Sequence, residues 1–131
     1  MPSNTDVING AYEAFGRGDV AAVFAAFAPD LEWTTPEGMK AHGIGGTRKG
    51  HAEIGAFFGQ LQAVFAELRL EPQEFVESGD RLVVLGTHHM RAPGGTIGTI
   101  RFVHSWTVVD GKAIRFEEFY DTAEVNRLLA S

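Results

Sequence analysis

Hydrophobic residues recur at helical spacing in the first half of the chain and at alternate positions in the second half. Spacings of three and four residues predict amphipathic helices, and a spacing of two predicts strands with one buried face. The helical patterns cover residues 6–16, 19–27 and 51–67, and a terminal helical turn covers 121–129. A short strand at 31–34 precedes a glycine-rich loop at 36–50, and further strands are predicted at 70–77, 80–91, 96–109 and 113–121.

Capping and turn residues separate these segments. Asp19 is the expected N-cap of the second helix, because a short acidic side chain can accept a backbone N–H there. Asp110-Gly111 predicts a two-residue hairpin turn between the last two strands. Helices come first and antiparallel strands follow, an order that is typical of an α+β fold with helices on one face of a curved sheet. We expect one domain over residues 1–131, since no linker or repeat divides the chain.

Composition and charge exclude several classes of function. The chain has 131 residues, of which 44% are apolar, and it contains ten phenylalanines and no cysteine. Its net charge of −6, without a cluster of lysine and arginine, argues against nucleic-acid binding. No apolar run approaches the roughly 20 residues of a membrane span. The N-terminus lacks a signal-peptide pattern, so we expect a cytoplasmic protein that does not bind membranes.

Seven segments carry a resemblance to a known family, namely residues 12–20, 27–33, 48–54, 57–58, 102–108, 110–112 and 119–122. In this order they resemble the SnoaL-like (polyketide cyclase-like) family of the nuclear transport factor 2-like superfamily. The resemblance covers nearly the whole chain. It implies a cone-shaped fold with N-terminal helices packed on a curved antiparallel sheet around one apolar pocket for a small hydrophobic ligand. Such a scaffold hosts cyclases, isomerases, epoxide hydrolases and members that only bind or dimerise, so it does not fix the reaction.

Two activities of this superfamily are not supported by the residues present. Ketosteroid isomerases carry an aspartate base immediately before a Pro-x-Gly motif, whereas Thr35 precedes Pro36-Glu37-Gly38 here. Limonene-type epoxide hydrolases use an Arg-x-Asp pair on a middle strand, and residues 86–90 contain no such pair.

The resemblance places an acid/base carboxylate at Asp121, at the end of the last strand. A carboxylate enclosed by apolar side chains is poorly hydrated, which raises its pKa and lets it exchange protons near neutral pH. The alternative is that Asp121 only caps the terminal helix.

His104 is the second catalytic candidate. A two-residue turn makes it face Glu117, and strict alternation places it on the same side of the sheet as Phe102, Phe119 and Asp121. On this register His104 and Asp121 lie about 13 Å apart, so they could bracket one ligand unless a bulge brings them closer. The alternative is a structural His–Glu pair across two strands.

The remaining candidates are aromatic residues of the expected pocket wall. Tyr12 and Trp33 each join an apolar body to a polar tip, although core packing is an alternative for both. Phe58, Phe102 and Phe119 are expected to complete the substrate-binding wall.

No metal, nucleotide or other cofactor is expected. His88 and His89 are neighbours in a strand, so they point to opposite faces and cannot chelate together. His42 and His51 have no partner at ligand spacing. The glycine-rich loop at 43–50 matches neither the dinucleotide fingerprint nor the P-loop pattern.

These features predict a cofactor-free, isomerase- or cyclase-type enzyme that moves a proton on a hydrophobic carbonyl compound. Asp121 would be its acid/base, and His104 would orient or polarise the substrate. The alternative is a non-catalytic ligand-binding or dimerisation module of the same fold. An open cavity above about 300 Å³ that reaches Asp121 would favour the enzyme, and a packed interior would favour the module.

A homodimer through the sheet is also expected, because the outer face of the closing hairpin is too apolar to face water. On the predicted register that face carries Val103, Ser105, Thr107, Val109, Ile114, Phe116 and Tyr120.

Overall fold

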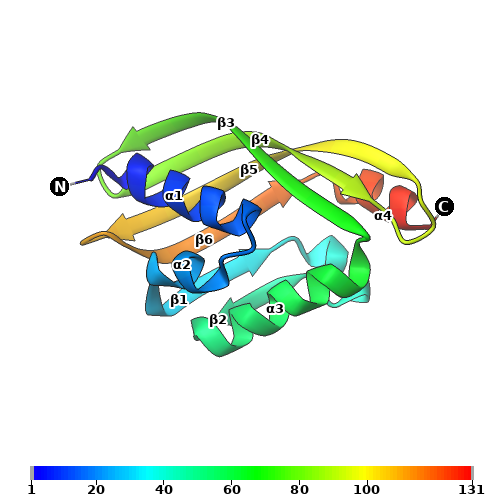
Figure 1. Cartoon of the computed structure of the whole chain (residues 1–131), viewed down its shortest axis with the longest axis horizontal. Helices are drawn as coiled ribbons and strands as arrows, with labels where there is room; N and C mark the ends of the chain where they lie inside the picture. Colours follow the sequence, from blue (N-terminus) through cyan, green and yellow to red (C-terminus); the bar gives the residue numbers. More distant parts are fainter. Residues whose placement is uncertain (1, 131) are drawn as a thin grey trace.

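The chain folds into helices that cover one face of a curved sheet of six strands (Figure 1). The computed structural model describes residues 2–130. The helices are α1 (Asn4–Gly16), α2 (Val20–Ala25), the 3-10 helix η1 (Glu37–His42), α3 (Gly50–Val64) and α4 (Thr122–Ala130). The strands are β1 (Phe27–Thr35), β2 (Gly46–Lys49), β3 (Glu67–Ser78), β4 (Arg81–Arg91), β5 (Ile97–Val109) and β6 (Lys112–Tyr120). No helix within the described residues is both long and apolar enough to cross a membrane.

The strands lie in the order β2-β1-β6-β5-β4-β3, and only the pairing of β1 with β6 is parallel. Helix α1 packs against α2 and β3, and α3 packs against β1 and β2. Figure 1 shows α1, α2 and α3 on the same side of the sheet, with α4 at the far end of the long strands. The predicted α+β class, with N-terminal helices on a curved sheet, is confirmed.

Two local signals in the sequence are confirmed. Asp19 caps α2, and its carboxylate accepts the backbone N–H of Ala22 at 3.1 Å. Asp110 and Gly111 form the two-residue turn between β5 and β6, with φ values of 51° and 75°. Positive φ at both positions is the geometry that hairpins of this length require, and Asp-Gly tolerates it.

The bounds of several elements differ from the prediction. Helix α2 ends at Ala25, and Phe27 already belongs to β1, which begins earlier than predicted. The loop predicted at 36–50 contains η1 and the edge strand β2. Strand β2 has only four residues and is stabilised by its pairing with β1. Four residues are too few for an alternating pattern to be recognised in the sequence.

A β-bulge in β6 changes the predicted register of the closing hairpin. Val108 pairs with Ala113, but the preceding Thr107 pairs with Arg115, so Ile114 has no partner across the ladder. A shift of one residue moves every following side chain to the other face of the sheet.

The prediction that His104 faces Glu117 is therefore wrong, and Glu118 lies opposite His104. The inward position expected for Phe119 is taken by Tyr120, which lies opposite Phe102. Phe119 lies on the outer face with 54% of its surface exposed, so it is not part of the pocket wall.

The space between the helices and the sheet is filled by large apolar side chains. Ile54 and Phe57 of α3 are buried, and Phe58 is partly buried against the same core. This confirms the predicted buried face of the helix. Phe116 and Trp106 also belong to this core, which corrects the expectation that Phe116 lies on the outer face.

Candidate functional site

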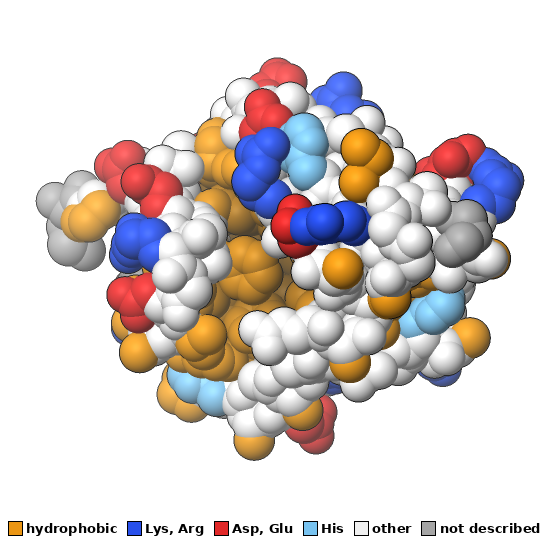
Figure 2. Space-filling model, turned by 45° about the vertical axis from the view of Figure 1, so that its right-hand side comes forward, with side chains coloured by type: hydrophobic (Ala, Val, Ile, Leu, Met, Phe, Trp, Pro, Cys, Tyr) orange, Lys and Arg blue, Asp and Glu red, His pale blue; other side chains and the backbone are white. Residues whose placement is uncertain are grey.

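An apolar cavity lies between the helices and the concave face of the sheet. Its walls are mainly aromatic, and polar side chains from α1, β4, β5 and β6 reach it at Tyr12, His88, His104, Glu118 and Tyr120. Figure 2 shows a hollow with hydrophobic walls on one face of the molecule. The walls combine bulky rings with a small group of polar side chains, the composition that small-molecule sites share.

The cavity is narrow. The space open to the centre of a water molecule is about 70 Å³, enough for several waters. It is smaller than the roughly 300 Å³ of ordinary ligand pockets.

Three of the predicted wall residues line the cavity, namely Tyr12, Trp33 and Phe58. Phe102 is not among the lining residues. It is 1% exposed, and its ring stacks on the imidazole of His104 with 4.0 Å between ring centroids. Phe102 therefore packs against His104 without lining the cavity itself.

Asp121 lies outside the cavity. Its carboxylate accepts the backbone N–H of Glu124 at 3.1 Å in an exposed position, which caps the first turn of α4. The enclosure by apolar side chains on which its predicted acid/base role depended is absent, and the capping alternative accounts for its position.

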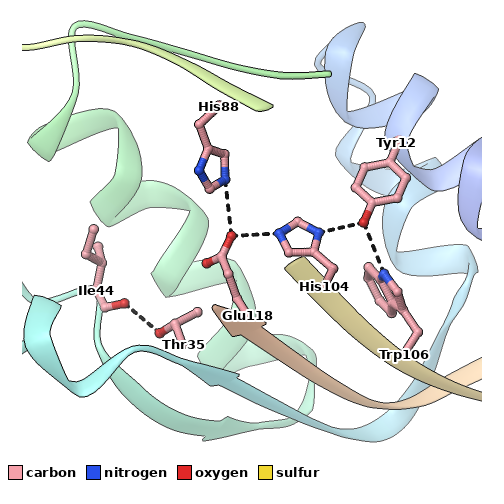
Figure 3. Close-up of polar contacts among 7 residues, drawn as sticks. All are labelled: Tyr12, Thr35, Ile44, His88, His104, Trp106 and Glu118. Carbon is pink, nitrogen blue, oxygen red and sulfur yellow. Dashed lines mark hydrogen bonds and ion pairs between the residues drawn. The ribbon is translucent and has the colours of Figure 1, made fainter. Parts of the chain in front are cut away.

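Thr35, which stands where ketosteroid isomerases carry their base, is also structural. Its buried hydroxyl donates to the backbone oxygen of Ile44 at 2.6 Å and so ties the loop after η1 to β1 (Figure 3).

The carboxylate inside the cavity belongs to Glu118, which the sequence analysis did not select. Its Oε2 lies 2.7 Å from Nε2 of His104 and 3.2 Å from Nε2 of His88 (Figure 3). The three side chains come from the neighbouring strands β4, β5 and β6. The side chains of His88 and His104 are 3% and 2% exposed, and that of Glu118 is 11% exposed. The site is therefore a buried carboxylate held by two imidazoles.

A chain of hydrogen bonds continues from His104 to helix α1. The indole N–H of Trp106 donates to the hydroxyl oxygen of Tyr12 at 3.1 Å, and that hydroxyl lies 2.5 Å from Nδ1 of His104. An indole N–H can only donate, so Tyr12 accepts from Trp106. An ionised carboxylate can only accept, so a neutral His104 carries its hydrogen on Nε2 and donates it to Glu118, and its Nδ1 accepts from the hydroxyl of Tyr12. One neutral imidazole and one ionised carboxylate satisfy all of these contacts.

The electrostatics agree with this assignment. Burial raises the pKa of the Glu118 carboxyl, but hydrogen bonds from His104 and His88 outweigh burial and hold that pKa at about 2. Burial lowers the pKa of His104, even though Glu118 favours its charged form. Burial also raises the pKa values of Tyr12 and Tyr120. At neutral pH the site therefore holds an ionised Glu118, a neutral His104 and two protonated tyrosines.

Several polar atoms of the cavity wall remain available. In Figure 3 the second oxygen of Glu118 points away from both imidazoles. Within residues 2–130, Nε1 of Trp33 and Nδ1 of His88 are buried without a hydrogen-bond partner, and both side chains line the cavity. An unpaired buried polar atom costs about 1–3 kcal/mol, so a ligand that bonded to these atoms would gain affinity.

The site predicts a loss of stability in acid. The folded protein keeps His104 neutral below the pKa of about 6.5 that histidine has in an unfolded chain. The unfolded state therefore binds more protons, and the free energy of unfolding falls as pH drops below that value. The lowered pKa of Glu118 acts in the same direction below the ordinary carboxyl range. In His104→Gln we expect the slope between pH 7 and 5 to decrease by up to about 1.4 kcal/mol per pH unit.

Urea denaturation of the chelator-treated protein at several pH values measures this slope. Glutamine can donate to Glu118 and accept from Tyr12, so the variant should fold. His42→Gln, at the end of η1 and outside the cavity, is the control and should keep the wild-type slope. An unchanged slope in His104→Gln would contradict the assignment.

Comparison with known proteins identifies the family of this chain. The sequence profile of the SnoaL-like domain matches residues 8–116. The chain belongs to the SnoaL-like family. A nuclear transport factor 2-like protein of unknown function from Burkholderia pseudomallei K96243 is 46% identical over 100% of both chains, with a TM-score of 0.96. The protein TerC, whose structure was determined with polyporic acid, is 43% identical over 98% of both chains, with a TM-score of 0.95.

An uncharacterised Mycobacterium tuberculosis protein is 29% identical to this SnoaL-like chain over 119 residues, which is 90% of this chain and 88% of the relative. The predicted resemblance is therefore confirmed over nearly the whole chain. Membership of the SnoaL-like family fixes the scaffold, while the reaction has to be argued from the residues in the cavity.

Proposed function

We propose that this SnoaL-like chain is an enzyme that transfers protons on a small aromatic carbonyl compound without a cofactor, with Glu118 as its acid/base. The observation that supports the proposal is the ionised Glu118 in the wall of an apolar cavity, with one oxygen held by His104 and His88. Two N–H donors fix the carboxylate, and its other oxygen is turned away from them (Figure 3).

In the proposed reaction the free oxygen of Glu118 takes a proton from a substrate carbon next to a carbonyl, or from an enol hydroxyl conjugated with one. The electron pair left behind is delocalised onto the carbonyl oxygen, which gives an enolate. The phenol of Tyr120 lines the same cavity and stays protonated, so it can donate a hydrogen bond to the enolate oxygen. Glu118 then returns the proton to another atom of the substrate, which completes an isomerisation or accompanies ring closure.

The low pKa of Glu118 restricts the substrate. A carboxylate with a pKa of about 2 is a weak base, so it can only remove a hydrogen that neighbouring groups have made acidic. Enolisable diketones and hydroxyquinones carry such hydrogens. The aromatic walls favour planar rings, and the unpaired atoms of Trp33 and His88 favour a compound with several oxygens.

Polyporic acid, an aromatic hydroxyquinone, is a suitable probe because TerC was crystallised with it. We expect saturable binding when its visible absorption is followed during titration with this protein. Trp33→Phe keeps the ring but removes the N–H, and should weaken binding by roughly 5- to 100-fold if that N–H contacts the ligand. Absence of binding by polyporic acid and by simpler aromatic hydroxy ketones would contradict the proposed ligand class.

The second candidate function is a non-catalytic binding or dimerisation module. The specific observation in its favour is the small free volume of about 70 Å³, because a nearly packed interior serves stability as well as binding. A protein that binds the probe but shows no proton transfer would support this alternative.

We also infer that the protein forms a homodimer through the outer face of the sheet. Ile97, Val103, Ile114 and Phe119 are large apolar residues with 36–76% of their surface exposed. Such residues together on an uncovered sheet mark an interaction surface. Light scattering at micromolar concentration should give about twice the chain mass of 14.2 kDa, and Phe119→Arg should shift it toward the monomer. A monomer mass for the wild type would contradict the inference.

A further inference from the structure

His88, His104 and Glu118 bring one possible metal-ligand atom each close together, and both imidazole nitrogens point to Oε2 of Glu118 (Figure 3). These atoms, one from each side chain, all lie within 4.8 Å of one another. In the sequence His88 has only its neighbour His89 as a possible partner, and no metal was expected. Three adjacent strands provide a set that no local spacing reveals, because residues 88, 104 and 118 are far apart in the chain.

We propose that these three side chains form a binding site for a divalent transition-metal ion. Metal–nitrogen and metal–oxygen bonds are about 2.0–2.2 Å long, so two ligand atoms at right or tetrahedral angles lie roughly 3.0–3.4 Å apart. The Oε2 atom of Glu118 is 2.7 Å from one imidazole nitrogen and 3.2 Å from the other. These two spacings approach those of a coordination sphere, and the two imidazole nitrogens, which lie within 4.8 Å of each other, would move closer around an ion.

The surroundings of the three side chains also fit a metal site. An imidazole that binds a metal with Nε2 carries its hydrogen on Nδ1, and a neighbouring oxygen usually accepts that hydrogen. Metal binding would therefore change the tautomer of His104, and the hydroxyl oxygen of Tyr12, 2.5 Å from Nδ1, is in the position to accept that hydrogen instead of donating its own. The carboxylate side chain of Glu118 can supply the negative charge that a buried cation needs.

The donor set indicates which ions would bind. Two imidazoles and one carboxylate suit Zn²⁺, Fe²⁺, Co²⁺ or Ni²⁺, whereas Ca²⁺ and Mg²⁺ prefer oxygen ligands alone. All three residues line the cavity, so the remaining coordination positions face the space that a ligand would enter. An ion there would replace the two N–H donors on Glu118, and it would therefore compete with the proton transfer proposed above. Metal binding itself does not depend on that function.

The test is a titration of chelator-treated protein with Co²⁺, followed by its visible absorption, and with Zn²⁺ in competition. We expect one ion per chain, and at least a tenfold loss of affinity in both His88→Gln and Glu118→Gln. His89→Gln is the matched control, because His89 forms a His–Glu pair with Glu71 at 2.7 Å that is not among the metal-binding groups. It should bind as the wild type does.

Equal affinity in the wild type and His88→Gln would overturn the proposal, as would an equal loss in His89→Gln. Near-ultraviolet circular dichroism establishes that each variant is folded. If a variant does not fold, the proton NMR spectrum of the Co²⁺-loaded wild type decides. Paramagnetically shifted signals from two histidine rings would support the site, and their absence would overturn it. No organic ligand is present in these experiments, so their failure leaves the proposed proton transfer untouched.

Discussion

Glu118→Gln should lower turnover by roughly 10²–10⁴-fold, the usual size of a general acid/base contribution. Glutamine keeps the shape of the side chain, and its amide oxygen can still accept from His104 and His88, but it cannot take up a proton. The measurement is the exchange of acidic hydrogens with D₂O, followed by proton NMR, for a panel of enolisable aryl diketones. The fold and the thermal transition should persist in the variant.

Two substitutions serve as controls for this experiment. Glu117 lies next to Glu118 in β6 but pairs with Ser105 and points to the other face, so Glu117→Gln should remain active. Asp121→Asn should also remain active, because asparagine caps a helix about as well as aspartate. Full activity in Glu118→Gln would remove the catalytic assignment, and loss of activity in Asp121→Asn would restore the role predicted for that residue from the sequence.

Phe57→Ala should destabilise the protein by about 3–5 kcal/mol. Phe57 is 4% exposed, and its ring lies 5.8 Å from that of Trp33 and 5.9 Å from that of Phe58, between ring centroids. The guanidinium carbon of Arg48 lies 4.9 Å from its centroid. Alanine would remove both the buried apolar surface and the ring on which these contacts depend. Urea denaturation measures the change.

Phe57→Leu is the matched variant, since a smaller change in volume should cost less than about 1.5 kcal/mol. If Phe57→Ala lowers the free energy of unfolding by less than about 1 kcal/mol, neighbouring side chains must refill the space left by the ring. That result would contradict the close packing around α3.

The hydrophobic pattern predicted the helices and long strands well because each of them buries one face, and burial imposes a period on the sequence. The Asp110-Gly111 turn was predictable for a similar reason, since few residue pairs tolerate positive φ at both positions. The cavity is lined as expected by Tyr12, Trp33 and Phe58. The periodicity and the family resemblance predicted which side of their segments is buried.

The carboxylate of the site was missed because of one bulge. Ala113 pairs with Phe27 of β1, and its N–H donates to the backbone oxygen of Ala26 at 2.8 Å. The pairing of β6 with β1 is irregular in the same region as the bulge beside Ile114. These contacts join residues that are far apart in the chain, so local alternation could not reveal that Glu118 faces inward.

The ionisation state of Glu118 tests the account most directly. Carbon-13 NMR of its side-chain carboxyl, assigned with the Glu118→Gln variant, should be followed from pH 8 to pH 4 in chelator-treated protein. The account predicts an ionised carboxylate throughout this range, because His104 and His88 hold its pKa at about 2. A carboxyl that is already protonated at neutral pH could not accept a proton from a substrate, and that result would contradict the proposed role of Glu118.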